Sequence, residues 1–162
     1  MKIVTIIGNR PQFIKTALIS QEIRIKNTEI LIHTGQHYDE NLSDIFFNEL
    51  NIPLPDINLG IAERQQGMQT GLMIQRIEEI LIDECPDCII VFGDTNSTLA
   101  GSIAGTKLHI PIIHIEAGLR SFNKIMPEEI NRIMTDHVST LLFCPNKYAV
   151  INLKKEGITE AA

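Results

Sequence analysis

The sequence contains 162 residues with a formal net charge of -6 and a pI near 5.3. One domain is the default at this length, and the hydrophobic fraction of 44% is that of an ordinary globular protein. The acidic balance excludes a sequence-independent nucleic-acid binder, which needs a basic face. The start of the chain lacks the longer apolar core of a signal peptide, and no apolar run approaches the roughly 18–20 residues of a membrane span. We therefore expect a soluble, cytoplasmic protein with no nucleic-acid or membrane partner.

The predicted strands are short apolar runs rich in β-branched residues. They lie at residues 2–7, 29–34, 56–59, 87–92, 110–115 and 139–144. The predicted helices show apolar residues at helical spacing or clusters of small residues. They lie at 11–25, 42–50, 67–84, 100–105, from 127 onward, and at 146–156. Because strands and helices alternate, the sequence predicts an α/β, Rossmann-like parallel sheet with helices on both faces, where ligands bind at the carboxyl ends of the strands.

The cysteines and histidines indicate no metal site. The cysteine count is odd, so Cys85, Cys88 and Cys144 form no disulfide framework. Cys85 and Cys88 make a C-x-x-C that closes a helical segment, whereas a redox pair opens a helix, where the dipole lowers the thiol pKa. No second such pair supplies zinc ligands. Four histidines are expected to be structural: His33, His109, His114 and His137.

Cations follow the first predicted strand. The strand ends at Gly8, Arg10 comes two residues later, and Lys15 lies one turn into the helix. The pattern G-x-G-x-x-G is missing, which disfavours a dinucleotide site. A glycine turn and a helix N-terminus, which carries about half a positive charge, still suit an anion. Arg10 and Lys15 are therefore either anion ligands or solvated cations at a helix start.

Carboxylates follow two further strands. Asp94 comes after the strand at 87–92 and either caps the next helix or serves a site. Glu116 directly follows the strand at 110–115. A carboxylate is rare there unless it is paired, and Arg120 is one available partner.

A third carboxylate opens a helix. Glu128 and Arg132 are four residues apart and share a helix face, as in an ordinary surface ion pair. If the three carboxylates and the cations converge at one end of the sheet, they provide acid–base chemistry beside an anion site. Such a site suits a phosphorylated or nucleotide-linked substrate.

Several short motifs occur in a fixed order along the chain. They are Gly8-Asn9-Arg10-Pro11 with Lys15, Thr34-Gly35-Gln36-His37, Gly93-Asp94-Thr95, and the stretches 114–121 and 126–132. This ordered set, which spans essentially the whole chain, resembles the non-hydrolysing UDP-N-acetylglucosamine 2-epimerase family. The family's first turn usually reads Gly-Thr-Arg-Pro-Glu, whereas Asn9 and Gln12 stand here.

The resemblance implies a two-domain, glycosyltransferase-B-like isomerase with its active site between the domains. Residues 1–162 would then be a single N-terminal domain, without the C-terminal nucleotide-binding domain. The family reaction interconverts UDP-N-acetylglucosamine and UDP-N-acetylmannosamine for cell-surface polysaccharide. UDP is eliminated to leave a bound glycal and is then added back. No cofactor and no metal are implied.

The resemblance also implies roles for individual residues. The catalytic group would be Asp94, Glu116 and Glu128. The substrate-binding cations would be Arg10, Lys15 and Arg132. A possible second, activating nucleotide-sugar site would contain Gln36, His37 and Arg64.

This domain, which would form only one side of the active-site cleft, is expected to be inactive alone, because catalysis needs reacting groups placed within fractions of an ångström. The expected partners are a UDP-sugar and either a second copy of the chain or a C-terminal domain. Two alternatives stay open. One is an epimerase for a related UDP-sugar, such as a diacetamido uronic acid, and the other is a non-catalytic half-domain that binds nucleotide or dimerises.

Overall fold

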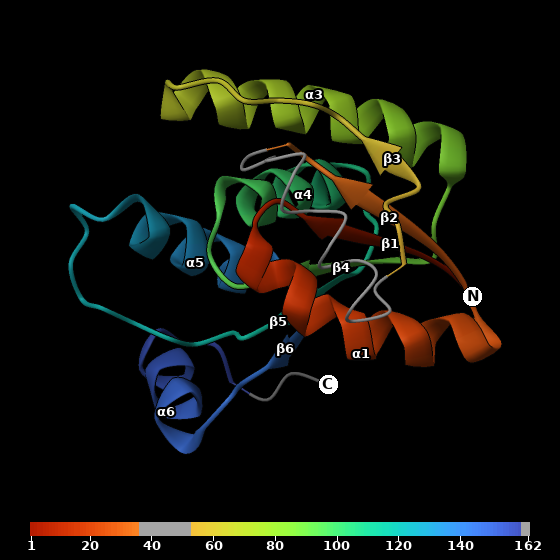
Figure 1. Ribbon diagram of the computed structural model, residues 1–162. Helices are drawn as coiled ribbons and strands as arrows, with labels where there is room; N and C mark the ends of the chain where they lie inside the picture. Colours follow the sequence, from red (N-terminus) through yellow and green to blue (C-terminus); the bar gives the residue numbers. More distant parts are fainter. Residues whose placement is uncertain (36–52, 160–162) are drawn as a thin grey trace.

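The computed structural model describes residues 1–35 and 53–159, which form a twisted parallel sheet between helices (Figure 1). The strands of the described part are β1 (Lys2–Ile7), β2 (Thr28–His33), β3 (Ile57–Asn58), β4 (Cys88–Phe92), β5 (Ile112–Ile115) and β6 (Leu141–Phe143). Their order is β3-β2-β1-β4-β5-β6, and every neighbouring pair is parallel. This is the Rossmann order, which reverses between β1 and β4. The predicted fold class is confirmed.

The described helices lie close to the predicted ones. They are α1 (Arg10–Lys26), α3 (Gln66–Glu84), α4 (Asn96–Lys107), α5 (Pro127–Val138) and α6 (Lys147–Lys155). The helix predicted at 42–50 lies outside the described residues. None of the described helices is long and apolar enough to cross a membrane.

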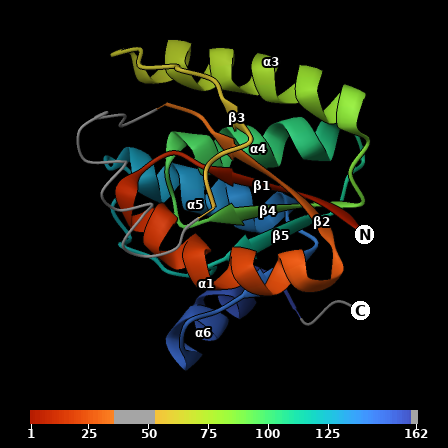
Figure 2. The same ribbon diagram turned by 45° about the vertical axis from the view of Figure 1, so that its right-hand side comes forward.

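The two faces of the sheet carry separate apolar cores. On one face, Met73 and Ile77 of α3 and Ala100 of α4 pack against side chains of β1 and β4. On the other face, Phe13 and Ile23 of α1 pack against the alternate residues of the same strands. Figures 1 and 2 show α3 and α4 on one side of the sheet and α1 on the other. The sheet is therefore buried on both faces, as its continuous apolar runs predict.

The small residues of α4 let this helix lie directly against the sheet. A Cβ atom built on Gly101 would lie 2.6 Å from Ile6 Cδ1, and one on Gly105 would lie 2.4 Å from Ile89 Cδ1. Real Cβ atoms do not lie this close to a neighbour, so a larger residue at either position would force these isoleucine side chains to move.

The turn after β1 is tied to the end of β4 by one buried amide. Asn9 and Gln12 form a capping box at the start of α1, each side chain accepting from the other's backbone N–H. The Gln12 amide also donates to the carbonyl oxygen of Phe92 at 2.6 Å. Asn9 and Gln12, the two departures from the family's usual turn, thus hold two strand ends at a fixed separation.

Candidate active site

The turns after β4 and β5 lie side by side at the carboxyl edge of the sheet. Phe92 pairs with Ile115, and the Gly93 N–H donates to the Ile115 carbonyl oxygen at 2.9 Å. The next residue, Glu116, has a φ of 78°, in the left-handed region that non-glycine residues rarely occupy. Its N–H donates to the Phe143 carbonyl oxygen at 3.0 Å, which helps hold this backbone in place. Such outliers cluster at functional sites.

Glu116 forms its ion pair with Lys15. The Lys15 ammonium group reaches across from α1 to Glu116 Oε2, joining the turns after β1 and β5. The alternative partner considered for Glu116 was Arg120, and that pairing is wrong. Arg120 instead binds Asp136 and Glu156, both of which lie far from Glu116 in the sequence.

Asp94 forms its ion pair with Arg132, which lies on α5. Arg132 also approaches Glu129 Oε2 at 3.4 Å, and its buried Nε has no hydrogen-bond partner in the described part of the chain. The expected surface pair between Glu128 and Arg132 is wrong, because the helix turns Arg132 inward to Asp94. Glu128 is exposed and has no ion-pair partner among the described residues.

The structure brings two of the three candidate carboxylates together. A Cβ atom built on Gly93, the residue before Asp94, would lie 3.3 Å from Glu116 Oε2. The carboxylate of Glu116 therefore lies against the turn that carries Asp94. Each of these two carboxylates holds one candidate substrate-binding cation, Lys15 or Arg132. The third, Glu128, lies one turn before Arg132 at the exposed start of α5.

The other predicted site residues are described only in part. Arg10 is the first residue of α1, and its side chain lies outside what the structure describes. Gln36 and His37 lie outside the described residues altogether. Arg64 is exposed in the segment that precedes α3. The predicted second nucleotide-sugar site therefore stays a prediction.

A chain of buried amides supports the Asp94 turn from behind. The Asn131 side chain on α5 donates to the Asp94 carbonyl oxygen at 3.0 Å and to Asn96 Oδ1 at 3.1 Å. Asn96 in turn donates to Gln69 Oε1 at 2.7 Å, and Gln69 donates to the Glu63 carbonyl oxygen at 2.9 Å. The Asp94 turn is thus connected through α4 to the start of α3. Nothing in the sequence pattern distinguishes these amides from surface residues.

Glu129 is a buried carboxylate whose role the sequence did not indicate. It accepts from the backbone N–H groups of Ser121 at 2.9 Å and Phe122 at 2.8 Å. Burial alone would raise its pKa, but these hydrogen bonds and the charge of Arg132 lower the pKa below its ordinary value. Glu129 is therefore a structural anchor for the loop between β5 and α5.

Asp136 is the second buried carboxylate that the sequence did not indicate. It lies in the last turn of α5, where the helix dipole disfavours an anion. This unfavourable position was the available signal that a strong partner exists. The partners are His114 at 2.7 Å and Arg120 at 2.7 Å. Burial alone would raise the pKa of Asp136, but these two neighbours lower it.

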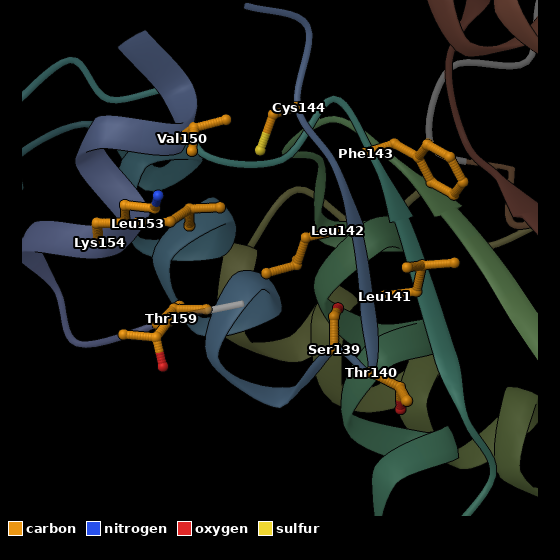
Figure 3. A pocket seen from close by; sticks show the side chains of 11 residues that line it. Ser139, Thr140, Leu141, Leu142, Phe143, Cys144, Val150, Leu153, Lys154 and Thr159 are labelled. Carbon is orange, nitrogen blue, oxygen red and sulfur yellow. The ribbon is translucent and has the colours of Figure 1, made fainter. Parts of the chain in front are cut away.

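A cavity of about 460 Å³ lies elsewhere, between β6 and α6 (Figure 3). Leu142 and Cys144 point into it toward Val150 and Leu153 of α6, whereas Phe143 points to the opposite side. None of the candidate carboxylates or cations lines this cavity. We therefore place the candidate active site at the carboxyl edge of β1, β4 and β5, at the reversal of strand order, where ligands bind in such sheets.

The fold and site together define a Rossmann-like domain with two cation-paired carboxylates at its switch point. The chain belongs to the UDP-N-acetylglucosamine 2-epimerase family, whose model matches residues 21–162. It is 61% identical over 158 residues to a UDP-N-acetylglucosamine 2-epimerase homolog of Methanococcus maripaludis. It is 57% identical over 164 residues to a UDP-2,3-diacetamido-2,3-dideoxy-D-glucuronate 2-epimerase of Pseudomonas aeruginosa.

The structure also matches solved relatives. A crystal structure of the Methanocaldococcus jannaschii UDP-GlcNAc 2-epimerase in complex with UDP-GlcNAc and UDP superimposes with a TM-score of 0.95 at 49% identity. That match covers 99% of this chain and 44% of the other. The alignments with the relatives from M. maripaludis and P. aeruginosa cover 98% and 100% of this chain. They cover only 44% and 46% of the relatives' own lengths. The chain thus spans less than half the length of the relatives it matches.

Proposed function

We propose that this chain supplies the acid–base half of a UDP-N-acetylglucosamine 2-epimerase active site. The observation that carries the proposal is the pair of carboxylates, Asp94 and Glu116, that flank Gly93 at the switch point, each joined to a cation. The relative from M. jannaschii, at 49% identity, was solved with UDP-GlcNAc and UDP.

The reaction requires more than one acid–base group. Removal of the proton from the acetamido-bearing carbon and departure of UDP from the neighbouring carbon create a double bond between the two carbons. When UDP is added back, a proton must reach the acetamido-bearing carbon from the opposite face. A single fixed side chain cannot serve both faces, so several carboxylates from different loops suit the chemistry. Asp94, Glu116 and Glu128 would supply these groups.

The cations would anchor the leaving diphosphate. Lys15 and Arg132 hold the carboxylates in the free chain, and the unpartnered Nε of Arg132 offers a further N–H. An arriving diphosphate competes for both cations. Loss of a neighbouring positive charge makes a carboxylate a stronger base, so substrate binding would itself prepare Asp94 and Glu116 for proton transfer. Arg10 would add to this anion site from the start of α1.

A related sugar nucleotide is the second candidate substrate. The P. aeruginosa relative, a UDP-2,3-diacetamido-2,3-dideoxy-D-glucuronate 2-epimerase, is 57% identical to this chain, compared with 49% for the M. jannaschii epimerase structure. Both reactions invert the same carbon, so the carboxylates described above serve either substrate. Substrate choice must then come from contacts with the remaining sugar substituents.

We also propose that activity requires a partner, either a C-terminal domain or a second copy of the chain. Exposed apolar side chains support association, since their burial against a partner is favourable. They include Ile14 and Leu18 on α1, and Leu141 and Phe143 on β6. Sedimentation that shows only monomer at high concentration would oppose self-association. A non-catalytic half-domain and the cytoplasmic location both stay predictions from the sequence.

The test uses deuterated water. Residues 1–162 are joined to the remaining part of the M. jannaschii epimerase or of the P. aeruginosa enzyme, and each chimera is incubated with both UDP-sugars. NMR should show deuterium at the acetamido-bearing carbon next to the UDP-linked carbon when a chimera is used, and no deuterium there when residues 1–162 are used alone. If no chimera exchanges this proton although the parent relatives do, the proposal is wrong. If both chimeras prefer the same UDP-sugar, the 162 residues that they share determine the substrate preference.

A further inference from the structure

Asp136 connects the two turns that carry Asp94 and Glu116. Its Oδ1 faces His114 Nδ1 at 2.7 Å. Its Oδ2 accepts from the Gly118 N–H at 3.1 Å, two residues after Glu116. One carboxylate, whose side chain is fully buried, thus holds the backbone of the Glu116 turn directly. It reaches the Asp94 turn through His114.

His114 has two hydrogen-bond acceptors and no donor around its ring. Its Nε2 lies 2.7 Å from the carbonyl oxygen of Gly93, which only accepts, and its Nδ1 faces Asp136, which only accepts when ionised. Asp136 Oδ2 also accepts from the Gly118 N–H at 3.1 Å and from the Arg120 guanidinium at 2.7 Å, and these two donors favour the ionised carboxylate. Both ring nitrogens must therefore carry a proton for both bonds to form.

The surrounding charges balance an imidazolium ion at this position. Arg120, also buried, donates to Asp136 Oδ2 at 2.7 Å and pairs with Glu156 through two bonds of 2.6 and 2.7 Å. With a proton on both ring nitrogens of His114, two cations, His114 and Arg120, would face two anions, Asp136 and Glu156. A buried charge is tolerated when it is paired and hydrogen-bonded, as each member of this cluster is.

The two bonded backbone groups lie just beyond Phe92 and Ile115, the last paired residues of β4 and β5. Gly93 and Gly118 both have positive φ values, 62° and 78°, and both follow the ends of their strands. Asp94 comes directly after the Gly93 carbonyl group. The separation of Asp94 and Glu116 therefore depends on how firmly these two turns are held to each other.

We propose that Asp136 is a positioning residue, which sets the separation of Asp94 and Glu116 by binding the Gly118 N–H directly and the Gly93 carbonyl group through a doubly protonated His114. The catalytic consequence rests on the proposed epimerase function. The hydrogen-bond arrangement does not, so it is tested separately.

The first test is NMR on the 162-residue chain labelled with ¹⁵N in histidine. At neutral pH both ring nitrogens of His114 should give signals of protonated nitrogen, each with a slowly exchanging proton. His137, whose side chain is 44% exposed, serves as the internal reference. An unprotonated nitrogen in the His114 ring would overturn the proposal, whether or not any epimerase activity is found.

The second test compares two variants on either side of Arg120. Asp136→Asn replaces one accepting oxygen by a donor, and Glu156→Gln alters a residue that contacts neither turn. Hydrogen exchange of the Gly118 amide should become faster in Asp136→Asn and stay unchanged in Glu156→Gln. In an active chimera, kcat of Asp136→Asn should fall about 10- to 100-fold with KM changed less than about threefold, because misplacement of reacting groups costs rate more than binding.

Equal effects of Asp136→Asn and Glu156→Gln on kcat would mean that Asp136 is merely structural. If Asp136→Asn does not fold, His114→Asn takes its place, since the shorter amide reaches Asp136 but not the Gly93 carbonyl oxygen. Unchanged kcat in that variant also overturns the proposal. A chimera that is inactive before any substitution contradicts the epimerase proposal alone, and the ring-nitrogen and amide-exchange results still decide the role of Asp136.

Discussion

Glu128 and Glu129 are consecutive at the start of α5, yet Glu128 is exposed and Glu129 is only 1% exposed. Glu129 turns back to two backbone N–H groups of the preceding loop, whereas Glu128 is exposed in the first turn of α5. Two identical residues at adjacent positions thus have separate tasks. The first is proposed for catalysis and the second for structure.

Glu129→Gln should destabilise the chain by about 1–3 kcal/mol, because it removes the charge of a buried carboxylate that accepts two backbone hydrogen bonds. Glu128→Gln should change the free energy of unfolding by less than about 0.5 kcal/mol, as at other exposed positions. In an active chimera Glu128→Gln should nevertheless abolish most epimerisation. Urea unfolding and the deuterium assay measure the two effects. The same loss of stability in both variants would contradict this division.

Gly8→Ala should destabilise the chain by about 1–3 kcal/mol through overpacking. An added Cβ atom would lie 1.9 Å from Ser97 Oγ and 2.8 Å from Thr34 Oγ1, both of them buried. Gly71→Ala is the control, since nothing lies within 4 Å of its added Cβ on the exposed face of α3. It should raise stability by up to about 1 kcal/mol, the helix propensity difference. Thermal unfolding of both variants measures these two changes in stability.

Lys15→Met should affect activity far more than stability. The Lys15 and Glu116 side chains are 41% and 30% exposed, and such pairs contribute at most about 1 kcal/mol. The Lys2–Glu84 pair, 38% and 35% exposed at the opposite end of β1, is a matched control. We expect Lys15→Met to lower kcat/KM at least about tenfold in a chimera, and Lys2→Met to leave it unchanged. Equal kcat/KM values for Lys15→Met and Lys2→Met would mean that Lys15 does not contribute to the active site.

The stability of the chain should decrease in acid, partly through Glu129 and Asp136. The pKa of each carboxyl group is lower in the folded state than in the unfolded chain, so unfolding takes up protons as the pH falls. Their contribution is complete above the ordinary carboxyl pKa of about 4 and is lost as the pH falls through the folded value. Urea unfolding from about pH 7 to about pH 3 should therefore show a shallower pH dependence in Glu129→Gln than in the unchanged protein. Parallel curves would contradict the lowered pKa.

The element order and the strand positions followed from the sequence because both are local properties. The run at β1, the capping residue Asn9 and the small residues of α4 each act within a few positions of the chain. The family motifs likewise named the carboxylates that the structure places at the sheet edge, Asp94 and Glu116. Their chemical roles stay proposals.

The pairing of charges did not follow from the sequence, because sheet order determines it. Glu116 was given the nearby Arg120 as an available partner, but Lys15 is brought beside it from 101 positions away. Arg132 was paired with Glu128 by helical spacing, but the packing of α5 on α4 directs it to Asp94. Spacing rules describe neighbours along one element, and they carry no information about the next strand in space.

The central position of β1 in the sheet has a consequence for folding during synthesis on the ribosome. β1 is synthesised before both of its neighbours, and β2, which pairs with it with Lys2 beside Thr28, follows closely along the chain. Its other neighbour is β4, where Ile3 lies beside Cys88. At roughly 5–20 residues per second, the ribosome needs on the order of several seconds to produce the intervening segment. During that interval the β4-facing edge of β1 is open, and folding competes there with aggregation until β4 emerges.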